Sequence, residues 1–158
     1  MDTMRAASIL KNIRTLHLRM KKHSENAIYL AKKLQKDGIK VIYPGLKNHP
    51  QHEIMKKNMN DGFGFGGMLV MDATSETKAN ELMEEMQAKN LGYLAVSLGF
   101  YKTLFSAPSL STSSEIDEKE RKKMGLTNSL VRISIGLDHD IERTYIKIKE
   151  CIKKIKIL

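Results

Sequence analysis

Leu130-Val-Arg-Ile-Ser-Ile-Gly136 is the stretch of sequence on which the fold prediction depends. Side chains along a strand change sides at every residue, so this stretch has one apolar face and one polar face. The apolar face consists of Val131, Ile133 and Ile135. The polar face carries Arg132 and Ser134. The pattern predicts a strand that packs one side into a core and holds Arg132 in the middle of a rigid element.

Working outward from this strand, the chain alternates between strand-like and helix-like patterns. Further strands are predicted at 39–43, 67–73 and 93–98. Helices are predicted at 50–59, from the Thr74-Ser75 cap to Asn90, at 117–124, and at the C-terminus, where Ile141, Tyr145, Ile148, Ile152 and Ile155 form one apolar face. A longer, irregular Ser/Thr/Pro stretch fills 99–114. We therefore predict an α/β fold with a four-stranded sheet covered by helices.

The first 37 residues predict one long helix that leads into this sheet. Apolar residues recur at spacings of three and four, and only His23 interrupts the stripe. The stripe consists of Ile9, Ile13, Leu16, Met20, Ala27, Leu30 and Leu34. Such a helix exceeds the usual 8–20 residues, so it needs a partner surface along much of its length, and a kink is compatible with the pattern. We expect one domain over 1–158, with a lead-in helix over 1–37 and the sheet and its helices over 38–158.

Composition narrows the class of protein. The chain has 158 residues, of which 41% are hydrophobic and 28% charged, which is typical of one globular domain. It has no run of about 18 apolar residues and no secretory leader, so we expect no membrane association. The single cysteine, Cys151, suits a reducing compartment, and we expect a cytoplasmic protein. The net charge of +9 is scattered and aromatic residues are few, so a solvated basic surface is favoured over nucleic-acid binding.

Arg132 is the strongest candidate site residue that the pattern alone provides. A guanidinium on a rigid strand can bind a carboxylate through two parallel hydrogen bonds. The alternative is an edge-strand arginine that faces water or pairs with an acidic neighbour. The spacing by itself favours that alternative.

Four other features receive structural interpretations. The glycines of 62–67 lead into a strand, whereas a phosphate-binding loop leads out of one into a helix, so we expect a flexible entry or a bulge. Lys78 follows Ser75 and Thr77 but lies in a polar first helical turn, where a solvated lysine is expected instead of a Schiff base. His49 and His52 lack further spaced ligands, so we expect no metal site. Cys151 is expected to be a partly buried small apolar residue.

Several segments together resemble the pyridoxal-phosphate enzymes of cysteine and methionine metabolism, among them cystathionine synthases and lyases, methionine γ-lyase and sulfhydrylases. The matching stretches are Leu16-His-Leu-Arg-Met20 with His23 and Asn26-Ala27, Tyr43-Pro-Gly-Leu46 with His49-Pro50, Gly66-Gly-Met-Leu69, Ala95-Val-Ser-Leu-Gly99, Thr103-Leu104 with Pro108 and Thr112, and Leu130-Val-Arg-Ile-Ser-Ile-Gly136. Their order and spacing hold over nearly the whole chain. The resemblance is to the C-terminal small domain of these fold-type I transferases.

The resemblance implies roles for a few residues. Arg132 corresponds to the arginine that receives the α-carboxylate of the substrate, and Ser97 corresponds to a serine that lines the same pocket. Thr112 matches the threonine of a Thr-His pair in the family, but Ser113 stands where the histidine is common. Leu110 likewise replaces a frequent serine. This loop has diverged, so the sulfur amino acid, and the choice between elimination and replacement, stay open.

The resemblance also implies what other parts of the enzyme supply. In the family, the lysine that holds pyridoxal 5'-phosphate and the groups that bind its ring and phosphate belong to a large upstream domain, and this chain starts just after that domain would end. We expect a catalytically inactive chain that binds no cofactor covalently. Its expected partners are a large cofactor-binding domain or chain, further copies in a homo- or hetero-oligomer, and a sulfur amino acid. The alternative is a free-standing, non-catalytic interaction module that retains the fold.

Overall fold

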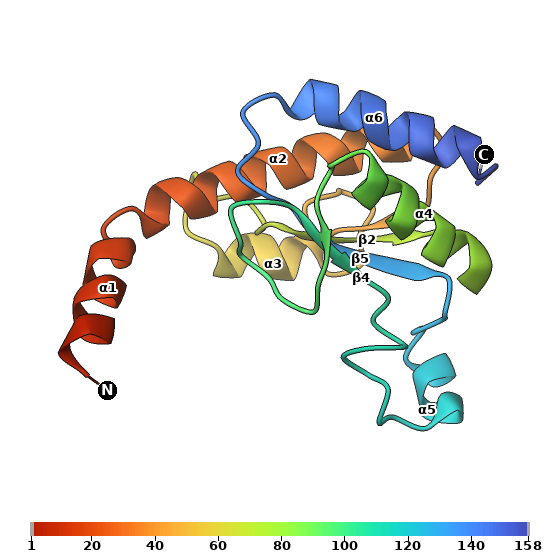
Figure 1. The fold of residues 1–158 in the computed structure, drawn as a ribbon, viewed down its shortest axis with the longest axis horizontal. Coiled ribbons are helices and arrows are strands. Elements are labelled where there is room, and N and C mark those ends of the chain that lie inside the picture. The colour runs from red at the N-terminus through yellow and green to blue at the C-terminus, as the bar shows by residue number, and fades with distance from the viewer. Residues whose placement is uncertain (1, 158) are drawn as a thin grey trace.

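The computed structural model describes residues 2–157, which form an α/β fold as predicted (Figure 1). In chain order the elements are α1 (Thr3–Ile13), α2 (Leu16–Lys36), β1 (Val41–Ile42), α3 (His52–Asn58), β2 (Met68–Asp72), α4 (Glu76–Ala88), β3 (Tyr93–Leu94), β4 (Leu104–Ser106), α5 (Glu118–Lys123), β5 (Leu130–Ser134) and α6 (Ile141–Lys154). The helix starts follow the polar residues that precede them. Asp2, Ser75 and Asp140, for example, each accept a hydrogen bond from a backbone N–H of the first turn.

The sheet has the strand order β1-β2-β5-β4-β3, so β5 is its central strand. Adjacent strands of the sheet pair antiparallel, except for β3 and β4, which are parallel to each other. The sequence predicts four strands and the structure has five, because β4 falls within the stretch predicted to be irregular. All three β4 residues are buried, so this strand lacks the alternation that reveals a half-exposed strand. The strand predicted over 93–98 is also shorter, since β3 ends at Leu94.

One face of the sheet packs against α2, α4 and α6 and forms the core (Figure 1). Val131 and Ile133 of β5 and Phe105 of β4 belong to this core, as alternation requires. Leu104 is buried but lies outside the core cluster, on the opposite face. That opposite face is the one that carries Arg132 and Ser134.

The predicted lead-in helix is divided at Arg14 and Thr15 into α1 and α2. Arg19 of α2 connects the two helices across this break, because its Nη2 donates to the Asn12 carbonyl of α1 at 2.8 Å. No residue of α1 is buried, and the buried residues of α2 begin only at His23. The first two turns of α2 and all of α1 therefore extend away from the body (Figure 1), with their apolar side chains exposed.

Three polar residues in one turn of α2 attach this helix to the sheet. His23 Nδ1 lies 2.6 Å from the Ile135 carbonyl oxygen, and Asn26 Nδ2 donates to the carbonyls of Gly136 and Asp138. Ser24 Oγ accepts the backbone N–H groups of Phe65 and Gly66, which precede β2. His23 thus interrupts the apolar stripe because it satisfies a buried backbone carbonyl.

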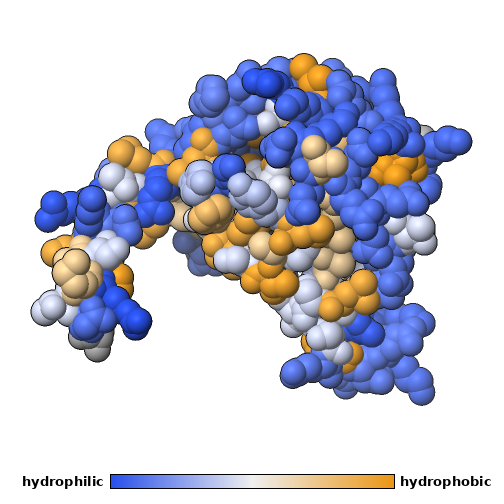
Figure 2. All heavy atoms as spheres, in the orientation of Figure 1, coloured by the Kyte–Doolittle hydropathy of each residue, from blue (hydrophilic) through white to orange (hydrophobic). Residues whose placement is uncertain are grey.

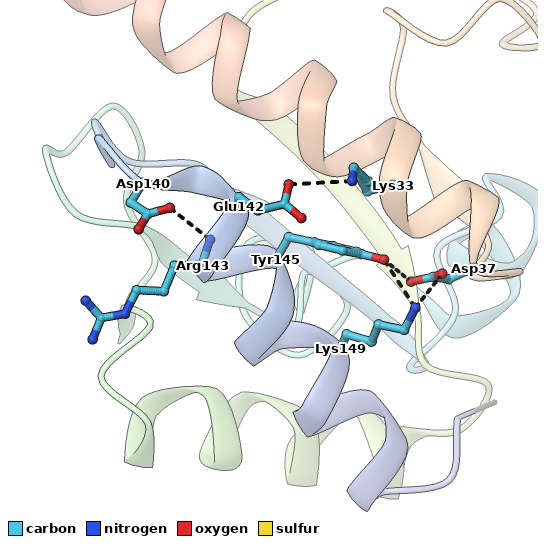
Figure 3. Close-up of polar contacts among 7 residues, drawn as sticks. All are labelled: Lys33, Asp37, Asp140, Glu142, Arg143, Tyr145 and Lys149. Carbon is cyan, nitrogen blue, oxygen red and sulfur yellow. Dashed lines mark hydrogen bonds and ion pairs between the residues drawn. The ribbon is translucent and has the colours of Figure 1, made fainter.

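A second polar cluster joins the C-terminal end of α2 to α6 (Figure 3). The Asp37 carboxylate accepts hydrogen bonds from Tyr145 Oη at 2.6 Å and Lys149 Nζ at 2.8 Å. The hydrogen bond from Lys149, followed by that from Tyr145, lowers the pKa of Asp37 below its usual value of 3.8. One turn earlier, Lys33 pairs with Glu142 at 3.5 Å.

Asp37→Asn should change how the stability of the chain depends on acid. A carboxylate whose pKa is lowered by folding stabilises the folded state above its unfolded pKa, and this contribution disappears as pH falls through the lowered value. The melting temperature of the variant should therefore fall below that of the wild type at pH 7, and the difference should shrink as pH falls below 3.8. Thermal melts at pH 7, 5 and 3 measure this, with the exposed Asp61→Asn as control. A difference that stays constant over this range would contradict the assignment.

None of the helices formed by residues 2–157 combines the length and apolar character needed to cross a membrane.

Candidate functional site

Arg132 occupies the middle of β5, the central strand of the sheet. Its ladder partners are Val70 on β2 and Ser106 on β4. The edge-strand alternative for Arg132 is therefore wrong. The side chain is partly exposed on the face opposite the helices, and its backbone is fixed by pairing on both sides. A guanidinium in this position loses little freedom when it binds a ligand.

The guanidinium of Arg132 makes one hydrogen bond, in which Nη2 donates to the Ser97 carbonyl oxygen at 3.4 Å. It forms no ion pair with any Asp or Glu of residues 2–157. The alternative in which an acidic neighbour neutralises Arg132 is therefore also wrong for the described part of the chain. Most of the N–H donors of the group remain available to an external carboxylate.

Ser97 lies next to Arg132, and the contact is made by its backbone carbonyl and not by its hydroxyl. The segment around Ser97 crosses the polar face of β5. Its next anchor is Gly99, whose backbone N–H donates to Ser134 Oγ at 3.0 Å. Arg132 and Ser134, two residues apart on one strand face, therefore both contact the Val-Ser-Leu-Gly segment.

The structure does not bring Thr112 and Ser113 into hydrogen-bonding contact with Arg132. Both bond to the carbonyl of Pro108, through Thr112 Oγ1 at 3.5 Å and the Ser113 backbone N–H at 2.9 Å. These residues form a local turn in the segment between β4 and α5. The turn leaves Thr112 exposed and Ser113 partly exposed.

Sequence reasoning missed two buried serines, one of which lies directly opposite Arg132. Ser106 and Ser109 are 5% and 0% exposed, and the hydroxyl oxygen of each is buried without a hydrogen-bond partner within the described chain. Unpartnered buried hydroxyls are uncommon in folded proteins. The signal that could have identified Ser106 is its place directly opposite Arg132, which requires β4 and its register to be known.

The segment that crosses the site is rich in exposed large apolar side chains. They are Tyr93, Leu94, Val96, Leu98, Phe100 and Tyr101. Lys102 Nζ donates to Tyr93 Oη at 2.7 Å and lies 5.0 Å from the centre of that ring. Figure 2 shows apolar atoms gathered on the side of the body that lies below α2 and beside the arm formed by α1. The site is therefore an open, partly apolar surface around a single guanidinium.

The other motifs have structural explanations. Lys78 Nζ donates to the Lys156 carbonyl at 2.6 Å and projects from α4, on the helix-covered side of the sheet. His52 Nδ1 lies 2.7 Å from the Pro44 carbonyl, and its ring stacks on Phe65. Cys151 is fully buried in the core, and burial raises the pKa of its thiol.

Comparison with known proteins gives a consistent result. A family model described as "Cys/Met metabolism PLP-dependent enzyme" matches residues 1–143. Methionine gamma-lyase of Arabidopsis thaliana is 42% identical over 146 residues, which cover 92% of this chain and 33% of that protein. Cystathionine beta-lyase of Coxiella burnetii is 37% identical over 142 residues, covering 85% of this chain and 35% of the relative. The chain thus spans about a third of the length of these relatives.

A solved structure from Campylobacter jejuni, named O-acetylhomoserine (thiol)-lyase, superposes with a TM-score of 0.82 at 33% identity. The match covers 91% of this chain and 34% of that one, which carries a pyridoxyl-lysine. This likeness confirms the predicted class, in which a small α/β unit belongs to a fold-type I pyridoxal-phosphate enzyme.

Proposed function

Because this chain belongs to the Cys/Met-metabolism family of PLP-dependent enzymes, we propose that it is the substrate-carboxylate-binding part of a sulfur amino acid lyase or synthase. One observation supports this function most strongly. Arg132 lies on the central strand, on the open face of the sheet, without an acidic partner in residues 2–157. An unpaired arginine on a rigid element suits the bidentate capture of an α-carboxylate.

In this proposal, Arg132 fixes the carboxylate end of the amino acid. The segment containing Ser97 and Gly99 forms the adjacent wall, since both residues are held to the Arg132 face by hydrogen bonds. The exposed Leu98 and Phe100 of the same segment shield the ligand from water. The turn that carries Thr112 and Ser113 lies further along the chain and adjusts which side chain the site accepts.

Pyridoxal phosphate, bound in the complete enzyme, supplies the electron sink for the chemistry of the family. Lys78 does not fit the role of its anchor, since its amine bonds the Lys156 carbonyl on the opposite side of the sheet from Arg132. We therefore assign the cofactor-binding lysine to a part of the enzyme outside this sequence. By itself, the chain would bind the carboxylate and would not turn over the substrate.

The exposed apolar stripe of α1 and the start of α2 is an argument for a large partner that covers it. Its exposed members are Ile9, Ile13, Leu16 and Met20, and Met4, Leu10 and Leu18 of the same two helices are exposed as well. Contiguous exposed apolar surface of this kind marks an interaction site. We propose that the cofactor-binding portion covers it, within an oligomer in the reducing cytoplasm, where the buried free thiol of Cys151 is stable.

A reconstitution experiment tests this function. The first two thirds of Arabidopsis thaliana methionine gamma-lyase, up to the region matched here, would be produced with this chain, either joined or as two polypeptides. We expect the pair to hold pyridoxal phosphate, detected by its visible absorbance, and to release a thiol from L-methionine or a related sulfur amino acid. The separate chain should do neither.

Two results would contradict the proposal. The first is covalent capture of pyridoxal phosphate, with thiol release, by the purified chain alone. The second is a stable assembly that binds the cofactor but shows no turnover of methionine, cystathionine or O-acetylhomoserine. That result would favour the free-standing interaction module.

A further inference from the structure

The hydroxyl of Ser106 has no assigned role in the fold. Its oxygen is buried and has no hydrogen-bond partner in residues 2–157, and the residue is 5% exposed. Burying a hydroxyl without a partner is unfavourable, so such a group needs an explanation. The explanation must involve something that can approach Ser106 from its own side of the sheet.

Arg132 is the residue that can approach. The two are direct ladder partners on antiparallel strands, so their side chains leave the same face, with Cβ atoms about 4.5–5.5 Å apart. Strand order adds a second constraint, because β4 lies between β5 and β3. The Arg132 guanidinium reaches the Ser97 carbonyl, which follows β3. Its side chain and the Ser97 segment lie on the same face of the sheet as Ser106, the directly opposite residue on β4.

The existing anchor of the guanidinium is weak. Its one hydrogen bond, from Nη2 to Ser97, is 3.4 Å long, at the outer limit for an N–H···O contact. A group that receives a carboxylate bidentately needs both its position and its plane fixed. A single long contact at one end fixes neither well.

We propose that Ser106 is a positioning residue, whose hydroxyl oxygen accepts an N–H of Arg132 when the guanidinium binds a ligand carboxylate. The planar guanidinium has five N–H donors, enough for Ser97, Ser106 and the two oxygens of a carboxylate. Ser106 would hold the inner edge of the plane against the sheet while the outer edge meets the ligand. This inference rests on the proposed function for the identity of the ligand.

Ser109 provides a matched comparison. Its hydroxyl is also buried and unpartnered, but Ser109 lies beyond the end of β4 and is not a ladder partner of Arg132. Its carbonyl instead accepts a hydrogen bond from Arg121. If an unpartnered hydroxyl merely held an ordered water molecule, Ser106 and Ser109 would be equivalent in experiments that report on Arg132.

The test uses the full ¹⁵N-labelled chain and the Nε–H signal of Arg132, identified by its loss in Arg132→Ala. L-Methionine is titrated over the millimolar range into wild type, Ser106→Ala, Ser109→Ala and Ser106→Thr, and solvent exchange of the Arg132 Nε–H is measured at saturation. Loss of one hydrogen bond of typical net strength predicts about five- to tenfold weaker binding and similarly faster exchange in Ser106→Ala. Ser109→Ala should match the wild type, and Ser106→Thr should recover most of the effect.

The outcomes separate the two proposals. If Ser106→Ala binds and exchanges as the wild type does, or if Ser109→Ala produces the same changes, the positioning role of Ser106 is overturned. If L-methionine fails to shift the Arg132 signal of the wild type, the carboxylate-binding function of this chain loses its support. Because Ser106 is assigned its role only while a carboxylate is bound, this outcome overturns the positioning role as well, whereas the first two outcomes overturn that role alone.

Discussion

Arg132→Ala should lower kcat/KM for L-methionine by about 10² to 10³-fold in the enzyme completed with its cofactor-binding portion. The loss is large because the substrate carboxylate would keep its charge and lose a bidentate partner. Among residues 2–157, Arg132 is the cation that bonds the Ser97 carbonyl, so no second cation is in place to take over when its guanidinium is removed. Folding should be little affected, since the side chain forms no ion pair with a described residue and lies outside the core cluster.

Steady-state kinetics of three variants measure this effect. Arg132→Lys keeps the charge but not the planar fork, so its kcat/KM should lie between those of the wild type and Arg132→Ala. Arg143→Ala removes the same charge from α6, on the helix-covered side of the sheet. Figure 3 shows the Arg143 guanidinium directed away from the Asp37 cluster. This control should retain wild-type kinetics. A loss of less than threefold in Arg132→Ala would exclude Arg132 as the carboxylate receptor.

The placement of Arg132 could be predicted because it depends on a local rule. Alternation along 130–135 determines which side chains enter the core, and the core contains Val131, Ile133 and Ile135. What alternation cannot show is the position of a strand within its sheet. Whether Arg132 lay at an edge or in the centre depended on which strands pair with β5, and these pairings join segments far apart in the sequence.

The missed strand β4 shows a second limit. All three of its residues are buried, although the helices cover only one of the two faces of the sheet. The other face is covered in part by the Ser97–Gly99 segment, which bonds Arg132 and Ser134. A strand buried by a loop has no periodic signal of its own. Because Ser106 belongs to this strand, its relation to Arg132 could not be derived from the sequence.

The family resemblance predicted which loop adjoins Arg132, but not through which atoms. Ser97 was expected to contribute as a pocket residue, and its carbonyl is the group in contact with Arg132. Backbone contacts carry almost no sequence signal, because every residue has a carbonyl. The contacts of Thr112 and Ser113 are likewise made with the backbone of Pro108.

Gly136 is a residue on which the geometry of this face depends. It follows β5 and passes so close to the segment before β4 that a Cβ atom would lie 2.6 Å from the Thr103 nitrogen and 2.7 Å from the Tyr101 oxygen. Its backbone N–H donates to Thr103 Oγ1, and its carbonyl accepts from Asn26. Because the obstructing atoms are backbone, they cannot move aside by a change of side-chain rotamer.

Gly136→Ala should therefore destabilise the chain by about 3 kcal/mol, at the upper end of the usual cost of overpacking. For a chain of this size, that corresponds to a melting temperature lower by about 6–12 °C. The matched control is Gly125→Ala, since Gly125 has a φ of +73° but open space around it. That variant should cost only the left-handed backbone penalty, about 1–2 kcal/mol.

Relief of the clash at Gly136 requires the 101–103 segment to move away from β5, and this segment leads directly into β4. Gly136→Ala should therefore also displace Ser106 and the Ser97 loop, and abolish the response of the Arg132 Nε–H to L-methionine, while Gly125→Ala should preserve it. Thermal unfolding and the same NMR titration measure both effects. If Gly136→Ala melts no lower than Gly125→Ala, the close approach between the end of β5 and the Tyr101–Thr103 segment does not exist in solution, and the geometry assigned to Arg132 and Ser106 fails with it.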